Sequence, residues 1–158
     1  MDKINIGQAP GGRHDGTPLR IAFDMINKNF DYLGSYSGRI QVDVSTNSWY
    51  DVASINDIAF DIELGIEIDG SIQSIKVSGG NLGTQSTINL LYSNILGEKI
   101  FDYIAITNNN GSYNVSFRAS KNGVIDVGYF SKSLINAKPL EVSFSNSPPM
   151  EILERIEL

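Results

Sequence analysis

The stretch Phe60-Asp61-Ile62-Glu63-Leu64-Gly65-Ile66-Glu67-Ile68 decides the fold, because large apolar residues alternate along it with polar or small ones. A period of two places one set of side chains on each face of a β-strand. Asp69-Gly70 follows and favours a tight hairpin turn, and a second apolar run covers 72–77. The stretch therefore predicts an antiparallel hairpin with one buried face and one exposed face.

The same period continues on both sides of this hairpin. Asn108–Gly111 and Asn122-Gly123 are further turn signals, and the glycine-rich segment 78–86 indicates a loop. The expected strands are 40–44, 60–68, 72–77, 88–92, 100–107, 113–119, 124–130, 140–144 and 150–157. This number of short strands predicts a mainly β fold, an antiparallel, jelly-roll-like β-sandwich over residues 35–158.

The N-terminal part has a different pattern. Glycine and proline in residues 1–16 oppose a regular element and indicate an extended leader, with Ile4 and Ile6 as its apolar anchors. Thr17 is a suitable N-cap and Pro18 a suitable first helical residue, so a short helix is expected over residues 17–34. Apolar residues recur in it at alternating intervals of four and three: Leu19, Phe23, Ile26, Phe30 and Leu33.

That spacing is typical of a heptad seam. The seam suits an oligomer in which several chains share the helix, and packing of the helix on the β-sandwich of its own chain is the alternative. About two heptads are too few to form a stable coiled coil alone and do not choose between two and three strands.

Composition excludes several classes of function. The chain has 158 residues, a net charge of -6 and 12 Lys and Arg without a basic stripe, so nucleic acid is not an expected partner. No cysteine and a single histidine, His14, leave no thiolate, disulfide or zinc site. No stretch approaches the roughly 20 apolar residues of a membrane span, and no secretory signal is visible. We expect no cofactor, metal or membrane partner.

Catalytic groups are also scarce. Asp61, Glu63 and Glu67 share one strand face at steps of roughly 7 Å, and a glycosidase needs two carboxylates beside a bond. The same spacing describes the solvated face of any acidic strand, which is the preferred interpretation. We therefore expect no catalytic residues and no enzymatic activity.

Aromatic side chains offer one candidate binding surface. Sugar C–H faces pack on aromatic rings as other apolar groups do. Trp49, Tyr50 and Tyr92 are the candidates for glycan contact, and burial in the sandwich core or in an interface between subunits is the alternative.

The stretch Ile4-Asn5-Ile6-Gly7-Gln8-Ala9-Pro10, continued by Asp15–Phe23 and Ile26–Phe30, resembles a segment of virion proteins of tailed bacteriophages. In those fibre, tail and neck-associated proteins it lies at or near the N-terminus. One departure is the insertion-like Gly11–His14. The resemblance implies attachment to other virion proteins of the capsid, neck or tail, through Ile4, Asn5, Ile6, Gly7 and Pro10.

Two functions follow from these observations. The first is a non-enzymatic virion protein, a short homotrimeric fibre, spike or decoration that is assembled in the bacterial cytoplasm and attached through its leader. The three-fold state is implied by the resemblance, with Leu19, Phe23, Ile26, Phe30 and Leu33 as the seam. The second is a carbohydrate-binding module that recognises a host-surface glycan.

Overall fold

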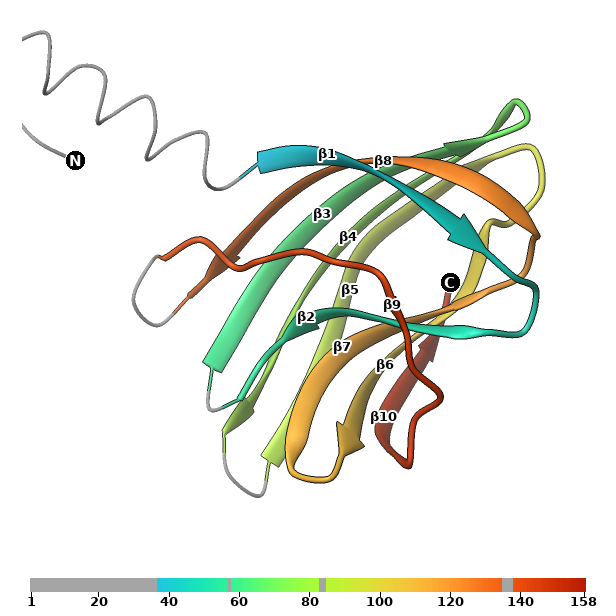
Figure 1. The fold of residues 1–158 in the computed structure, drawn as a ribbon. Helices are drawn as coiled ribbons and strands as arrows, with labels where there is room; N and C mark the ends of the chain where they lie inside the picture. Colours follow the sequence, from blue (N-terminus) through green and yellow to red (C-terminus); the bar gives the residue numbers. More distant parts are fainter. Residues whose placement is uncertain (1–36, 57, 83–84, 135–137) are drawn as a thin grey trace, which may run out of the picture. The chain divides into compact units, whose positions relative to one another are not determined.

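The computed structural model describes residues 37–158, apart from 57, 83–84 and 135–137. These residues form ten β-strands in two antiparallel sheets of five strands each (Figure 1). Sheet A has the order β1 (Ser37–Val44), β8 (Gly123–Ser133), β3 (Ile58–Ile68), β4 (Ser71–Leu82), β5 (Gln85–Leu96). Sheet B has the order β10 (Glu151–Glu157), β6 (Phe101–Asn109), β7 (Ser112–Ala119), β2 (Trp49–Ser54), β9 (Ser145–Asn146).

The expected hairpin lies at the centre of sheet A. β3 and β4 pair in register, with Ile62 opposite Val77. Asp69 and Gly70 connect them with positive φ angles of 47° and 75°, which a tight hairpin turn requires and which Asp and Gly tolerate. The prediction from the alternating stretch 60–68 is confirmed.

Strands distant in sequence close the two sheets. β1 pairs with β8 and β2 pairs with β7, in the nested manner of a jelly roll. β3, β4 and β5 instead form a meander of consecutive neighbours in sheet A. The prediction of an antiparallel sandwich is therefore confirmed for the described residues. The order differs from a jelly roll in one respect, because β3, β4 and β5 follow one another within sheet A and do not alternate between the two sheets.

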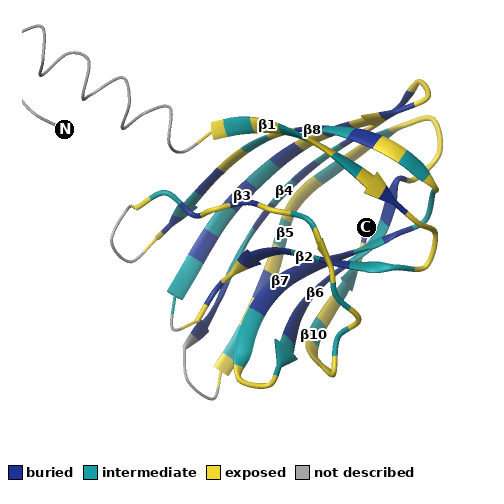
Figure 2. Ribbon diagram, in the orientation of Figure 1, coloured by how far each residue is buried: buried dark blue, intermediate teal, exposed yellow. Residues whose placement is uncertain are grey.

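The core lies between the inner faces of the sheets. Buried and exposed residues alternate along the strands of sheet A (Figure 2). Phe60, Ile62 and Leu64 of β3 have no exposed surface. Phe101 and Phe117 of sheet B meet edge to face, with ring centroids 5.5 Å apart. Full burial of each such side chain contributes about 1.5–3 kcal/mol, so the alternation alone stabilises the sandwich substantially.

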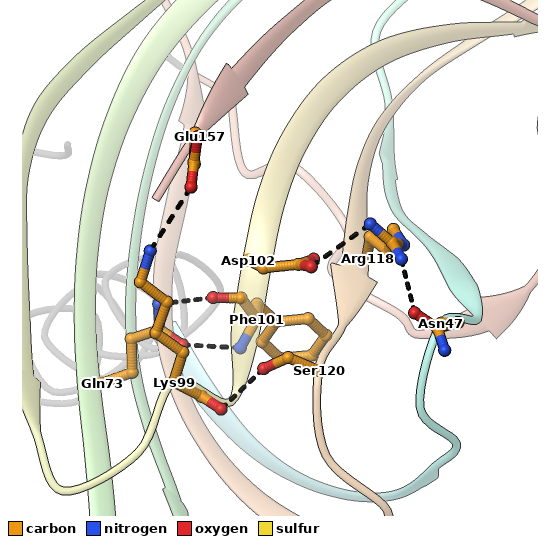
Figure 3. Close-up of polar contacts among 8 residues, drawn as sticks. All are labelled: Asn47, Gln73, Lys99, Phe101, Asp102, Arg118, Ser120 and Glu157. Atoms are coloured by element: carbon orange, nitrogen blue, oxygen red, sulfur yellow. Dashed lines mark hydrogen bonds and ion pairs between the residues drawn. The ribbon is translucent and has the colours of Figure 1, made fainter.

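One polar side chain links the two sheets through this core. Gln73 of β4 is completely buried. Its Nε2 donates to the carbonyl oxygen of Phe101 at 2.9 Å, and its Oε1 accepts from the amide of Phe101 at 2.8 Å (Figure 3). The same Oε1 accepts from the amide of Ile100 at 3.2 Å. The side-chain amide thus pairs with the start of β6 as a neighbouring peptide group would, and satisfies backbone groups that would otherwise be buried without partners.

Two expected elements are wrong. Segment 78–86 is not a loop, because β4 continues to Leu82 and β5 begins at Gln85. Gly79 and Gly80 allow close packing of the paired strands: a Cβ on Gly79 would overlap the carbonyl oxygen of Thr87 on β5. Residues 140–144 do not form a strand, and the next strand is the short β9 at Ser145–Asn146.

The N-terminal predictions fall on residues outside the described part of the chain. These are the leader over 1–16, the helix over 17–34, the attachment residues Ile4, Asn5, Ile6, Gly7 and Pro10, and the seam Leu19, Phe23, Ile26, Phe30 and Leu33. They remain predictions.

Candidate functional site

The three candidate glycan-contact residues lie in three different environments. Tyr50 is only 2% exposed and belongs to the core. Its hydroxyl accepts a hydrogen bond from the amide of Ser45 at 2.8 Å. A buried ring cannot stack on a sugar, so the prediction for Tyr50 is wrong. Successive residues of a strand point to opposite faces, which also means that Trp49 and Tyr50 cannot form one binding surface.

Trp49 lies on the outer face of sheet B, opposite in direction to Tyr50. Its strand register places it beside Arg118, and Arg118 lies beside Tyr103 on the next strand. The Arg118 guanidinium is 5.4 Å from the centre of the Tyr103 ring and 3.3 Å from the Asp102 carboxylate. It also donates to Asn47 (Figure 3). Three contacts therefore hold Arg118 in one place between two aromatic residues.

Asp51, two residues after Trp49 and on the same face, is the centre of a polar network. One carboxylate oxygen accepts from Ser116 at 2.6 Å and from Thr107 at 3.5 Å. The other accepts from the side-chain amides of Asn109 at 3.1 Å and Asn114 at 3.2 Å. Four donors from β6 and β7 use most of the acceptor capacity of a carboxylate, so the first role of Asp51 is to tie β2 to these strands.

A depression of about 290 Å³ adjoins this network. It is lined by one carboxylate, two amides and several hydroxyls: Asp51, Ala53, Ser54, Asn109, Ser112, Asn114, Ser143, Ser145 and Ser147. These groups suit hydrogen bonding to a polar neutral ligand. With a single titratable residue, the lining does not assemble the pair of carboxylates that glycoside hydrolysis requires.

Tyr92 lies on the outer face of sheet A, remote in topology from Trp49. It is 39% exposed, and its hydroxyl donates to a Glu63 oxygen at 2.8 Å. Lys76 donates to the other Glu63 oxygen at 3.0 Å. These bonds, from Lys76 first and Tyr92 second, lower the pKa of Glu63 below its ordinary value of 4.5, and the same contact raises the pKa of Lys76. Glu63 is thus held ionised, which opposes use as a proton donor.

The other acidic residues of the same face confirm the expected alternation. Asp61 and Glu67 share the outer face of β3 with Glu63, and Asp61 lies 3.7 Å from Lys132. Glu63 and Asp61 are each paired with a lysine and Glu67 is exposed, which describes a charge-paired outer face. His14, in the leader, is outside the described residues.

Two further searches cover only the residues with described positions. Within them, no group of three or more His, Cys, Asp or Glu side chains gathers as a metal site would require. Nor does that part of the chain contain a helix of the length and apolarity needed to cross a membrane.

Sequence reasoning did not find the residues that organise the face around Trp49. Asp51, Asn109 and Asn114 come from three strands. Asn109 and Asn114 are each more than fifty residues from Asp51 in the sequence. The only local signal was the period of two, which places Asp51 on the same face as Trp49.

Comparisons with known proteins assign the chain to no family. No family model matches the chain, and no curated protein matches it. Among solved structures, it is similar to the tailspike protein of the Acinetobacter phage vB_ApiP_P1, at 14% identity and a TM-score of 0.45. The match covers 90% of this chain and 26% of that one, so the chain spans about a quarter of that protein's length. A likeness at this level shows neither a shared activity nor a shared ligand.

Proposed function

We propose that the chain is a non-enzymatic structural protein of a tailed-bacteriophage virion, a short homotrimeric fibre, spike or decoration. The observation that carries the proposal is the stretch from Ile4 to Leu33, with its INIG start and its DGTPLR and IN-x-NF elements. In this proposal the leader binds capsid, neck or tail proteins, and the helix gathers three chains.

The described residues supply a core of their own. Their buried hydrophobic side chains lie at positions 44–158 and pack between the two sheets. In the proposal, this sandwich is the exposed domain and residues 1–16 attach it to the virion. The mixed, paired charges on the outer face of sheet A suit an exposed structural domain.

Deletion of residues 1–16 tests attachment. We expect the truncated protein to fold, to keep its oligomeric mass and to be missing from purified virions, while the full chain is incorporated. Ile4→Asp is a milder variant with the same expectation, and Asp2→Asn is its matched control at a polar position. Normal incorporation of the truncated chain would overturn the proposed attachment.

Light scattering tests the trimer. The expected mass is about 52 kDa, three times the 17.3 kDa of one chain. Phe23→Asp, on the seam, should give a folded 17.3 kDa monomer, whereas Asn27→Asp, off the seam, should remain trimeric. A monomeric full-length chain would refute the three-fold state and would favour packing of the helix on its own sandwich.

A further inference from the structure

The outer face of sheet A has a trough whose floor is a row of three small residues. Gly65 of β3 lies opposite Gly128 of β8 on one side and Ser74 of β4 on the other. Side chains of the neighbouring rows rise beside them. The resulting depression has a volume of about 320 Å³ and is lined by Arg39, Gly65, Ile66, Glu67, Ile72, Asp126 and Gly128.

The fold itself does not require the two glycines. Neither Gly65 nor Gly128 has a positive φ, the backbone conformation for which glycine is usually needed. A Cβ on Gly65 would meet no atom within 4 Å, and one on Gly128 would meet only the Gly65 carbonyl oxygen, at 4.0 Å. Glycine inside a strand destabilises it, and in such a place it often marks the close approach of a ligand.

Exposed apolar groups stand at the sides of the trough. The Tyr92 ring is fixed beside its floor, because the Tyr92 hydroxyl accepts from Ser74 at 3.5 Å and donates to Glu63 at 2.8 Å. Phe130 follows Gly128 by two residues on the same face of β8 and is 41% exposed. Ile72, on the opposite side, is 44% exposed. Two aromatic rings and an aliphatic side chain thus border a floor of bare backbone.

The charged groups of the trough disfavour an anionic ligand. Asp126 is 3.3 Å from Arg39 and accepts from Gln41 at 2.9 Å, so its charge is already compensated. With Glu67 the lining holds two carboxylates and one guanidinium, and an anionic ligand would be repelled. These charged groups can still bond to the hydroxyl groups of a ligand. The carboxylates of Glu67 and Asp126 accept hydrogen bonds, and the Arg39 guanidinium donates several.

We propose that this trough binds a neutral oligosaccharide. The apolar face of a sugar ring would pack against Tyr92, as apolar groups pack on aromatic rings. The hydroxyls would bond to Glu67, Asp126 and Arg39. The volume of the depression lies at the lower end of the range of ligand pockets, about 300–1,000 Å³, which suits a few sugar units. This site is independent of the proposed attachment through the leader.

A variant that fills the floor tests the proposal. Gly65→Val places a branched side chain in the open space above the strand, where β-branched residues are favoured. Ser78→Val is the matched control, since Ser78 faces the same side of β4 but lies beyond the Lys76 row. The probe is an array of immobilised neutral and uronic-acid-containing bacterial oligosaccharides, followed by titration of the best neutral binder.

We expect binding to neutral oligosaccharides, lost by about tenfold or more in Gly65→Val and unchanged in Ser78→Val. Thermal melting of Gly65→Val at or above the wild-type temperature would show that the loss is local. The absence of binding to any neutral oligosaccharide, a preference for the acidic ones, or wild-type affinity in Gly65→Val would each overturn the proposal. Virion incorporation of Gly65→Val should be normal, which separates this test from that of the attachment.

Discussion

Replacement of Gln73 by leucine should destabilise the sandwich more than any exposed polar substitution. The change removes three hydrogen bonds, at 2.8, 2.9 and 3.2 Å, and leaves the amides of Ile100 and Phe101 and the carbonyl of Phe101 buried without these partners. Each such orphaned group costs about 1–3 kcal/mol, and the apolar leucine offsets part of this. We expect a loss of about 3–5 kcal/mol in the free energy of unfolding.

Urea unfolding followed by circular dichroism and by the fluorescence of Trp49, the single tryptophan, measures this loss. In a domain of this size the melting temperature should fall by roughly 10–20 °C. Gln41→Leu is the control, because Gln41 is exposed and donates one bond to Asp126 at 2.9 Å. Its effect should stay within about 0.5 kcal/mol. A loss below about 1 kcal/mol for Gln73→Leu, or one equal to the control, would refute the reasoning.

Gln73→Glu separates hydrogen bonding from shape. A protonated carboxyl group donates to the Phe101 carbonyl and accepts from the amides, as the glutamine does, whereas an ionised one has no proton to donate. Compared with the wild type at the same pH, this variant should therefore regain stability as the pH falls. A deficit independent of pH would mean that the bond to the Phe101 carbonyl contributes nothing.

Three further predictions concern the faces of the two sheets. The pKa of Glu63 is depressed in the folded state, so the ionised Glu63 stabilises the fold above its unfolded pKa near 4.5. This contribution is lost as the pH falls through the lower pKa of the folded state. In Lys76→Met, NMR titration should show the pKa of Glu63 rising toward 4.5. Asp51→Asn should cost about 2 kcal/mol in urea unfolding, since its new NH₂ group faces other donors, while a cost near zero would contradict the network. Tyr50→Phe should lose about 1 kcal/mol and Tyr50→Ala about 3–5 kcal/mol; equal losses would contradict burial of the ring.

Much of the sandwich was predictable because its signals are local. The period of two in 60–68 and the Asp69-Gly70 turn depend on neighbouring residues alone, and both predictions are confirmed. The expectation of a loop over 78–86 is wrong, because a glycine-rich stretch usually indicates a loop. Gly79 and Gly80 are instead strand residues, where a Cβ would crowd the paired strand.

The candidate sites depended on contacts that no local pattern contains. Trp49 and Tyr50 are adjacent in sequence and therefore point to opposite faces of β2. Tyr92 lies beside Ser74 and Glu63 only because β3, β4 and β5 form a meander. The trough is a property of register, since Gly65 and Gly128 meet through the pairing of β3 with β8. Alternation alone could not indicate that these two glycines are neighbours.

The nested pairing of β1 with β8 has a consequence for how the chain folds. β3, β4 and β5 pair with neighbours in sequence, and so do β6 and β7. β1, in contrast, pairs with β8, which is synthesised much later in the chain. Such distant pairing is slow, and until it occurs an edge of β8 is open. During synthesis the β1 of a neighbouring copy can pair with the same open edge. Exchange of this strand between copies is therefore the misassembly to expect when nascent chains are crowded, and conditions that dilute them should raise the yield of correctly closed sandwich.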